Sequence, residues 1–600
     1  MNKMKPCRRA PALTGLALLL GSFLFSPAQP RNAPLIALND LQPGMKGEVW
    51  TVFKGNEPEP FAVQVTGILR NALGPGKNMI LCELTDPRVQ TMGAVAGMSG
   101  SPLYLDGKLA GVLAYQIQRF ETVRYAGFTP INDMLELSSL PAAGKDGLAP
   151  TPIPIKGNTA SRSSPASALS GNISPLSPAF SAGGLSPQVA EMLAPQFQSL
   201  GIAFNSLGGS VDAGESSAKV GEPPKPLQAG GVVAVALAMG DITIAGTGTV
   251  SHVDGNHILA FGHPMMSLGA TELPMASAEV VTILPSQLNS MKVSNTGGII
   301  GSFSQDRLSG IYGELGRQPP MVPVEISFPD RLNRKSLNFS VVRHEQVLPI
   351  IAASGLAQAV MGSNESGFTR GFRVTTTVEF PGSAPVKLSK LYPGPQGFNQ
   401  GLTEFVGNLS LWLFNPYERI FPERIRFSVE ATPDTPQGVV EQLQVSRAEA
   451  APGEHVDLTV GWRGFQRMPA QELLGLDVPR EWAGRDLEVV VTTGPVLDEL
   501  TGRSRTFQVA QLRSFEEYIA ALREFRESDG LYVAVVERSR LLTDQRDTTP
   551  DMPGSLERIA RGADEARFQR RDALTPLWER RILPDMLFNI LIRKPLSVTE

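Results

Sequence analysis

The sequence predicts a mainly β protein that contains more than one folded unit. Its 600 residues include 59 glycines and 49 prolines but only 7% aromatic residues, which is typical of β-rich, loop-rich chains. Apolar and polar residues alternate in many short runs, and Asp-Gly turns separate some of these runs. A chain of 600 residues is long enough for several domains with sizeable cores.

The first 29 residues are predicted to be a secretory signal peptide. A positively charged start is followed by an apolar run from Ala12 to Phe25 and by the small-residue sequence Ser26-Pro27-Ala28. A retained membrane anchor is the alternative, but the run is shorter than the roughly 20 residues that a spanning helix needs. We therefore expect an exported protein, periplasmic or extracellular in a bacterium, without a stable transmembrane anchor.

The charge of the chain argues against one class of partner, and its cysteine content argues against stabilisation by disulfides. The formal net charge of −4 provides no basic field for nucleic acid, so no nucleic-acid partner is expected. Cys7 lies in the signal, which leaves Cys82 alone in the mature chain. No intramolecular disulfide can then form, and Cys82 is predicted to be a core thiol in an apolar strand.

Residues 40–140 are predicted to form the first folded unit, with five or six short strands. Val49, Thr51 and Phe53 alternate as in a half-buried strand, and an Asp106-Gly107 turn joins two apolar runs as in a hairpin. Residues 141–190 are rich in Pro, Ser and Ala without sustained periodicity, which indicates a linker. A processing or docking segment is the alternative for this stretch.

Residues 191–348 are predicted to form a second β unit. A hairpin turn at Asp254-Gly255-Asn256 precedes a strand that ends close to His263. His252 and His257 lie near His263 and Asp254, which raises the alternative of a metal site. Their spacing fits no common zinc motif, and the turn alone accounts for Asp254, so neither a metal nor a cofactor is expected.

The remainder of the chain is predicted to be β-rich with a small helical element. We expect a β-rich region at 349–435, an immunoglobulin-like β-sandwich at 436–500 and an α/β region at 501–600. Ser514-Phe515-Glu516-Glu517 is a capping box that opens a helix, and Met586 to Ile592 is predicted to be a closing strand. Such β modules most often bind or space, so an envelope protein partner is one expectation.

The motif with the clearest chemistry is Gly97-Met98-Ser99-Gly100-Ser101-Pro102. Glycines on both sides of Ser99 allow a tight turn that exposes a hydroxyl and leaves backbone N–H groups free to face an anion. The alternative is a Gly/Ser/Pro turn without chemistry. Asp86 and His263 supply the other residue types of a nucleophile, base and orienting group.

These segments together resemble one known family. Two stretches resemble the SpoIVB-type serine peptidases, named for stage IV sporulation protein B. The first runs from Leu84-Thr85-Asp86-Pro87 through the serine motif to Phe128-Thr129-Pro130, and the second runs from Gly248 through His263 to Gly313. The two stretches stand here in swapped order, because in the sporulation protein the histidine half comes first. The resemblance covers about two fifths of the chain and implies a chymotrypsin-like double β-barrel peptidase domain assembled from two segments.

The resemblance also implies roles for individual residues. Ser99 would be the nucleophile, His263 the general base and Asp86 the orienting group, with the backbone N–H groups of Gly97 and Ser99 as the oxyanion hole. Ser101 is the alternative nucleophile, disfavoured because Pro102 restricts its backbone. The expected function is an exported serine endopeptidase that acts on a protein or peptide substrate, regulatory or self-processing. The alternative is a catalytically inactive protease-like scaffold or binding protein of the cell envelope.

Overall fold

The computed structural model describes most of the chain and leaves nearly all of the predicted signal and most of the predicted linker outside. The described residues are 29–30, 33–117, 123–141, 173–176, 178–202, 204–205, 209–210, 226–286, 290–329, 334–362, 370–503, 514–543, 548–550, 552–563, 569–583 and 585–600. Strands account for 51% and helices for 19%, which confirms the mainly β fold class. Within the described residues, no helix combines the length and apolar character that a membrane crossing needs.

The first unit is a closed ring of six antiparallel strands. In spatial order the ring contains β4 (Pro102–Leu105), β1 (Lys46–Val52), β2 (Pro58–Gly74), β3 (Lys77–Leu84), β6 (Tyr125–Pro130) and β5 (Lys108–Ile117), and β5 pairs back to β4. Alternate side chains fill its interior, among them Val49, Phe61 and Cys82. Cys82 is a free, fully buried thiol, and burial raises its pKa to about 12, as expected for a core cysteine.

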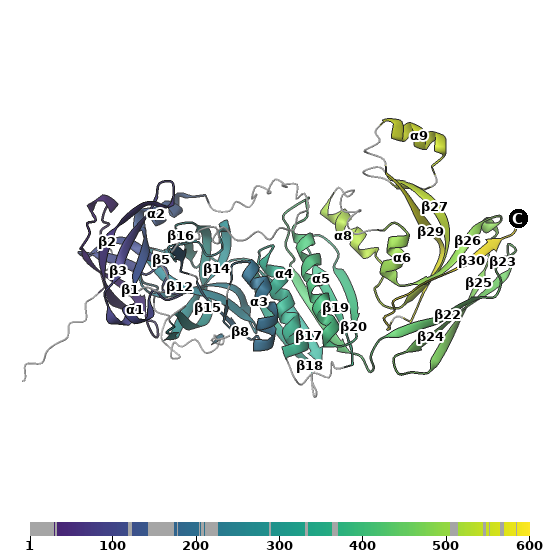
Figure 1. Cartoon of the computed structure of the whole chain (residues 1–600), viewed down its shortest axis with the longest axis horizontal. Helices are drawn as coiled ribbons and strands as arrows, with labels where there is room; N and C mark the ends of the chain where they lie inside the picture. Colours follow the sequence, from purple (N-terminus) through teal and green to yellow (C-terminus); the bar gives the residue numbers. More distant parts are fainter. Residues whose placement is uncertain are drawn as a thin grey trace, which may run out of the picture.

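A second closed ring of six strands follows in the chain and in space. It contains β11 (Val232–Gly240), β14 (Gly269–Leu284), β15 (Met291–Arg307), β16 (Gly310–Leu315), β13 (His257–Ala260) and β12 (Thr243–Asp254), and β12 pairs back to β11. Figure 1 shows the two rings side by side at the N-terminal end of the described chain. Two rings are what a two-barrel domain requires, while its chymotrypsin-like character stays a prediction.

The long β14–β15 hairpin holds the two rings together. Val280 pairs with Gly55 of the first ring, and Met291 pairs with Ala96 just before the serine motif. Ser290 Oγ donates a hydrogen bond to the carbonyl of Met92 at 2.7 Å. Polar contacts on both sides of the hairpin end therefore fix the serine motif against the second ring.

The sheet of the second ring continues into an α/β layer. Its strands are β18 (Arg334–Val342), β17 (Met321–Pro329), β21 (Arg424–Ala431), β19 (Phe372–Glu379) and β20 (Val386–Tyr392). The helices α3 (Pro187–Ser199), α4 (Val347–Ala357) and α5 (Pro395–Leu413) lie along this layer, as Figure 1 shows. Every residue of α4 is buried, so this apolar helix forms the centre of the layer.

The C-terminal part is a sandwich of two sheets that share one core. One sheet contains β22 (Gly438–Val445), β24 (His455–Gly464) and β25 (Pro469–Asp477). The other contains β23 (Glu449–Ala450), β30 (Leu591–Val598), β26 (Asp486–Thr492), β27 (Leu531–Thr543), β28 (Thr548–Pro550) and β29 (Gln569–Ile582). The shared core includes Leu458 from the first sheet and Val489 from the second. The immunoglobulin-like character of this region remains a prediction.

Two predicted local elements of this part can be compared with the structure. Helix α8 (Phe515–Arg523) begins after Ser514, whose Oγ accepts a hydrogen bond from the N–H of Glu517 at 3.2 Å, so the predicted cap is confirmed. The predicted closing strand is wrong in its bounds, because β30 begins at Leu591. Residues 585–590 instead form irregular chain whose Leu587 bonds to Pro436.

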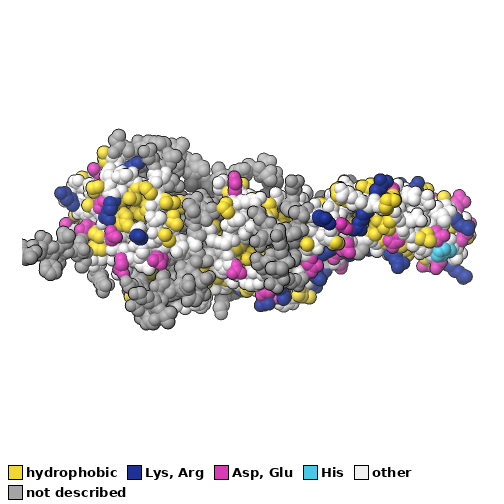
Figure 2. Space-filling view, turned by 90° about the horizontal axis from the view of Figure 1, so that it is seen from below, with side chains coloured by type: hydrophobic (Ala, Val, Ile, Leu, Met, Phe, Trp, Pro, Cys, Tyr) yellow, Lys and Arg dark blue, Asp and Glu magenta, His cyan; other side chains and the backbone are white. Residues whose placement is uncertain are grey.

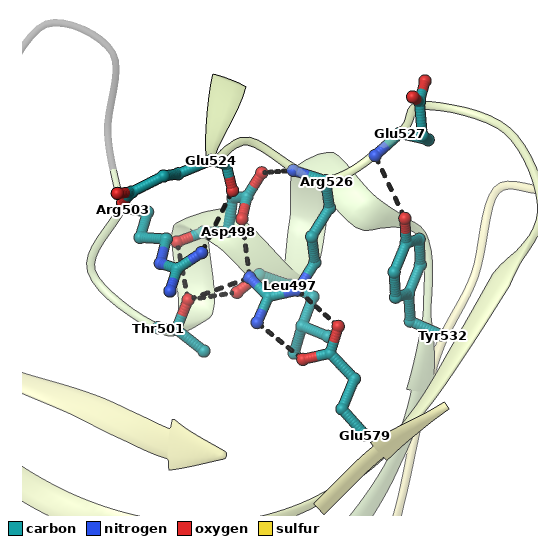
Figure 3. A network of polar contacts seen from close by, with 9 residues as sticks. All are labelled: Leu497, Asp498, Thr501, Arg503, Glu524, Arg526, Glu527, Tyr532 and Glu579. Carbon is teal, nitrogen blue, oxygen red and sulfur yellow. Dashed lines mark hydrogen bonds and ion pairs between the residues drawn. The ribbon is translucent and has the colours of Figure 1, made fainter. Parts of the chain in front are cut away.

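Buried ion pairs hold the C-terminal part together and join it to the α/β layer. In the network of Figure 3, the Arg526 guanidinium donates to Asp498 at 2.6 Å and to Glu579 at 2.7 Å. Asp529 is fully buried and accepts from Arg581 at 2.7 Å and from Arg373 of β19 at 3.0 Å. On the face that Figure 2 draws, by contrast, acidic and basic side chains are interspersed over the sandwich.

Candidate active site

The serine turn lies at the junction between the two rings. Gly97 and Gly100 both adopt the left-handed conformation, with φ of +93° and +95°. A Cβ on Gly100 would overlap the carbonyl oxygen of Thr249 in the second ring. Only glycine therefore allows the turn to approach the second ring this closely.

Thr249 of β12 connects the serine turn to the strand end that carries His263. Its N–H donates to the carbonyl of Ser99 at 2.8 Å, and its own carbonyl accepts from the N–H of Phe261 at 3.3 Å. Phe261 and Gly262 both have a φ of +69°, which turns the chain sharply before His263. Thr129 Oγ1 of the first ring fixes this turn by donating to the carbonyl of Gly262 at 2.6 Å. The structure thus brings the two predicted halves together within one chain.

The predicted nucleophile and the predicted base are both buried, and neither Ser99 Oγ nor His263 Nε2 has a hydrogen-bond partner among the described residues. Ser99 is 0% exposed and His263 is 1% exposed. A buried polar group without a partner costs about 1–3 kcal/mol, so each such group calls for an explanation.

The imidazole of His263 is held by its own neighbour. Nδ1 lies 2.8 Å from the carbonyl oxygen of Pro264, so the ring carries its proton on Nδ1 and a lone pair on Nε2. Burial lowers the pKa of His263 to about 4, although the backbones of Pro264 and Leu176 oppose this shift. At neutral pH the ring is therefore uncharged and can accept a proton.

Asp86 does not join the junction of Ser99 and His263, and its role is to stabilise a helix. It caps helix α1 (Pro87–Met92), because its carboxylate accepts a hydrogen bond from the N–H of Arg88 at 2.8 Å. It also pairs with the Arg88 guanidinium, and these contacts outweigh desolvation and hold its pKa below the usual value. The partners found for the Asp86 carboxylate are Arg88 and the backbone of Ala62, so the structure does not bring this carboxylate to His263.

The N–H groups that were predicted to form the oxyanion hole differ from the other N–H groups of the turn in their hydrogen bonding. Met98, Gly100 and Ser101 use their N–H groups in backbone hydrogen bonds within the turn or to β5. Among the described residues, no partner is found for the N–H groups of Gly97 and Ser99. The alternative nucleophile Ser101 is committed, because its Oγ donates to the carbonyl of Met98 at 2.6 Å.

Two residues near the site were not assigned a role from the sequence. Asp306 is 1% exposed, and its carboxylate accepts from the N–H groups of Met265 at 2.7 Å, Met266 at 2.9 Å and Leu268 at 3.1 Å. It therefore fixes the loop that follows His263. Desolvation raises its pKa, although these N–H groups counteract the effect.

The other unassigned residue is a buried lysine beneath the serine turn. Lys292 is 1% exposed, and its Cβ and Cδ would each lie 3.2 Å from a Cβ on Gly97. Its Nζ donates to Thr51 Oγ1 at 2.9 Å, and burial lowers its pKa to about 7. The sequence did contain a signal for it, because Lys292, Ser294 and Thr296 alternate along one strand and form a polar face that is buried.

His257, which is close to His263 in the sequence, has a local partner. Tyr312 stacks on His257, and its hydroxyl lies 2.8 Å from His257 Nδ1. No group of three metal-ligating side chains that could hold an ion is found among the described residues.

The structure therefore places a serine turn and a buried neutral histidine at the junction between two β rings, and serine and histidine are two of the residue types used in serine hydrolase sites. The SpoIVB peptidase S55 family matches residues 24–135 of the chain, which confirms the resemblance for the segment that carries Ser99. No curated protein and no solved structure is significantly similar to the chain. The segment that carries His263 lies outside the matched residues, and the swapped order stays a prediction.

Proposed function

We propose that the chain is an exported serine endopeptidase whose catalytic pair is Ser99 and His263. The observation that carries the proposal is the junction at Thr249, which joins the serine turn of one ring to the histidine strand end of the other. The family match supports a peptidase, and a peptidase implies a protein or peptide substrate.

In the proposed reaction, Ser99 Oγ attacks the carbonyl carbon of a peptide bond while Nε2 of His263 takes its proton. The N–H groups of Gly97 and Ser99 stabilise the oxyanion, and the proton then passes to the leaving amine. Water hydrolyses the resulting acyl-enzyme by the same route in reverse. Removing one oxyanion donor in such sites costs on the order of 10²–10³ in rate.

The orienting role is assigned to the carbonyl of Pro264 and not to Asp86. The hydrogen bond at Nδ1 selects the tautomer that leaves Nε2 free to act as the base. Asp306 supports this arrangement through the three N–H groups of the following loop. The sequence prediction of a complete Asp-Ser-His triad thus gives way to a pair that is oriented by the backbone.

The test is covalent labelling of the purified mature protein with a fluorophosphonate probe, with the modified residue located by mass spectrometry. We expect the label on Ser99, with no label there in Ser99→Ala and a loss of at least 10³-fold in His263→Ala. Ser101→Ala is the matched control and should label like the wild type. Label that persists in His263→Ala would contradict the proposed base.

The same purified proteins distinguish self-processing from the scaffold alternative. If the chain cleaves itself, the Ser99→Ala variant should accumulate at full length while the wild type is shortened. If no form of the protein reacts with the probe, the chain is better described as an inactive protease-like scaffold, with the C-terminal sandwich as the expected contact for an envelope partner.

A further inference from the structure

A short segment of the chain lies along the strand that supports the serine turn. Strand β7 (Ile173–Pro175) pairs antiparallel with the last part of β5, so that Ile173 lies opposite Ile117 and Pro175 opposite Tyr115. The next residue, Leu176, donates its N–H to the carbonyl of Ala114 at 2.8 Å. The first ring closes through β4 and β5 without this segment, so β7 is an added strand.

This added strand ends at the site. The carbonyl of Leu113 accepts from the N–H of Gly100 in the serine turn, and the carbonyl of the next residue, Ala114, accepts from Leu176. The backbone of Leu176 also lies near the His263 ring, where it acts to raise the pKa of that ring. Leu176 therefore lies near both the serine turn and the imidazole.

Further along the chain, Ala179 lies next to the serine turn. The Cβ of Ala179 would lie 3.3 Å from a Cβ on Gly97, and β8 (Ala179–Gly183) continues along β12 of the second ring. The segment is thus close to His263 at Leu176 and close to Gly97 at Ala179. Both Ser99 and His263 are buried, although they lie at a junction between two rings.

We propose that Ile173–Leu176 occupies the substrate channel of the Ser99/His263 site, and that peptide substrates bind in its place. This rests on the proposed function. A substrate would bind as an extended strand antiparallel to Tyr115–Ile117, with an apolar side chain of leucine size at the position of Leu176. Addition of a peptide strand to a sheet edge gives affinity through the backbone and specificity through alternate side chains.

The side chains of the segment define the expected preference. Leu176 is 3% exposed and belongs to the apolar core of the first ring, so its position is an apolar pocket. Pro175 has no N–H, and it stands opposite Tyr115, next to the hydrogen-bonded pair of Leu176 and Ala114. Alternation along an antiparallel pair places it where no ladder hydrogen bond is made. Substrates with proline before the apolar residue should therefore be accepted.

A reversible crosslink tests the proposal. Ile117 and Ile173 share the parity of Tyr115 and Pro175, so they form a non-hydrogen-bonded pair with Cα atoms about 4.5 Å apart, within disulfide range. We expect the oxidised double variant Ile117→Cys/Ile173→Cys to react with the fluorophosphonate probe at Ser99 at least 10-fold more slowly than its reduced form. Equal rates in the two forms would overturn the proposal. Cys82, the one other cysteine of the mature chain, is buried and will not compete.

A second variant weakens the segment without a crosslink. Leu176→Ala should raise the labelling rate of Ser99 at least 5-fold, and Leu41→Ala is the matched control because Leu41 is buried in the same core. The labelling rate should be unchanged in the control. If both variants accelerate labelling equally, general loosening of the core explains the effect and the proposal fails.

Peptide binding separates this proposal from the proposed function. A fluorescein-labelled peptide with the sequence of residues 172–176 should bind Leu176→Ala more tightly than the oxidised crosslinked variant, measured by fluorescence anisotropy. Binding of this kind without any labelling of Ser99 would support the channel and contradict the peptidase. Labelling that depends on His263 but is unaffected by crosslink or variant would support the peptidase and contradict the channel.

Discussion

The carbonyl oxygen of Pro264 lies 2.8 Å from Nδ1 of His263. This contact fixes the imidazole tautomer, as a carboxylate does in a complete triad. A carbonyl carries no net charge, so it stabilises the imidazolium less than a carboxylate would. A base oriented in this way and buried completely should act only when substrate binding or displacement of the covering segment changes its surroundings.

Replacing Asp86 should affect stability and not labelling. Asp86→Ala removes the cap of α1 and should cost about 1 kcal/mol of unfolding free energy. Asp86→Asn keeps a capping residue, and its exposed ion pair with Arg88 contributes little. For both variants the fluorophosphonate labelling rate of Ser99 should stay within about threefold of wild type, whereas loss of a triad carboxylate costs roughly 10⁴. A loss of that size in a folded Asp86→Asn protein would restore the predicted triad.

Replacing Asp306 should lower both the stability of the protein and the labelling rate of Ser99. The variant Asp306→Asn keeps one oxygen where the carboxylate accepts three N–H groups, so at least one buried donor loses its partner. We expect a loss of about 1–3 kcal/mol in the free energy of unfolding. Because the loop after His263 loosens, labelling of Ser99 should fall at least 10-fold at temperatures where the variant is fully folded.

The control for Asp306 is Asp241→Asn. Asp241 also accepts a backbone hydrogen bond, from Asn338 at 2.6 Å, but between β11 and β18 and away from the site. Its replacement should leave labelling unchanged. If Asp306→Asn and Asp241→Asn label at the same rate, Asp306 does not position His263.

Local signals in the sequence predicted the elements that depend on near neighbours. The Asp106-Gly107 hairpin is present between β4 and β5, with both residues at positive φ, as a two-residue turn requires. The Asp254-Gly255 turn likewise joins β12 to β13. The glycine-rich turn drew attention to Ser99, whereas His263 was singled out only through the resemblance to the SpoIVB-type peptidases.

The sequence also contained the signal for the actual role of Asp86. Asp followed by proline is a helix-start pattern, with the aspartate as cap and the proline at the first helical position. The structure confirms this arrangement at Asp86 and Pro87. The family resemblance pointed to catalysis instead, and the local pattern was the better guide to what the side chain contacts.

Contacts between distant segments could not be predicted. Lys292 reaches Thr51 across 241 positions of sequence, and Leu176 reaches His263 from beyond a stretch of uninformative composition. Which strands close each ring, and which strand is added beside β5, depend on pairing between segments whose apolar patterns are nearly equivalent. A single sequence does not distinguish among such pairings.

The depressed pKa of His263 predicts an unusual pH dependence. Its folded pKa of about 4 lies below the value of 6.5 in the unfolded chain. Between these values the unfolded state binds more protons, so stability is lost as the pH falls from 6.5 towards 4, by up to about 1.4 kcal/mol per pH unit. Thermal unfolding at pH 7, 6 and 5 should show this decline in the wild type and a weaker decline in His263→Gln.

The labelling rate should follow the same group. We expect it to be flat from pH 8 down to about 5 and to fall below that, because the ring stays neutral down to its lowered pKa. An inflection close to pH 6.5 in the wild type would mean that His263 is exposed to solvent in the resting protein. This outcome would contradict a covered resting state, and the oxidised crosslinked variant would show whether a fixed segment restores the flat profile.

Because Lys292 is buried, the stability of the protein should rise as the pH becomes alkaline. Its folded pKa of about 7 lies below the ordinary value of 10.5, so the unfolded state binds more protons between pH 7 and 10.5. The free energy of unfolding should therefore rise with pH in this window, by at most about 1.4 kcal/mol per unit. Lys292→Met removes the buried amine while keeping an apolar stem, so its unfolding midpoint should be nearly constant from pH 7 to 9.

The matched control is Lys77→Met. Lys77 is a partly exposed lysine that pairs with Asp133 and Glu136, and these carboxylates raise its pKa against the opposing desolvation. Its replacement should leave the alkaline rise in stability intact. Urea unfolding of the three proteins at pH 7, 8 and 9 distinguishes the cases. If Lys292→Met still gains stability between pH 7 and 9 as the wild type does, the amine beneath Gly97 is already solvated in the folded protein.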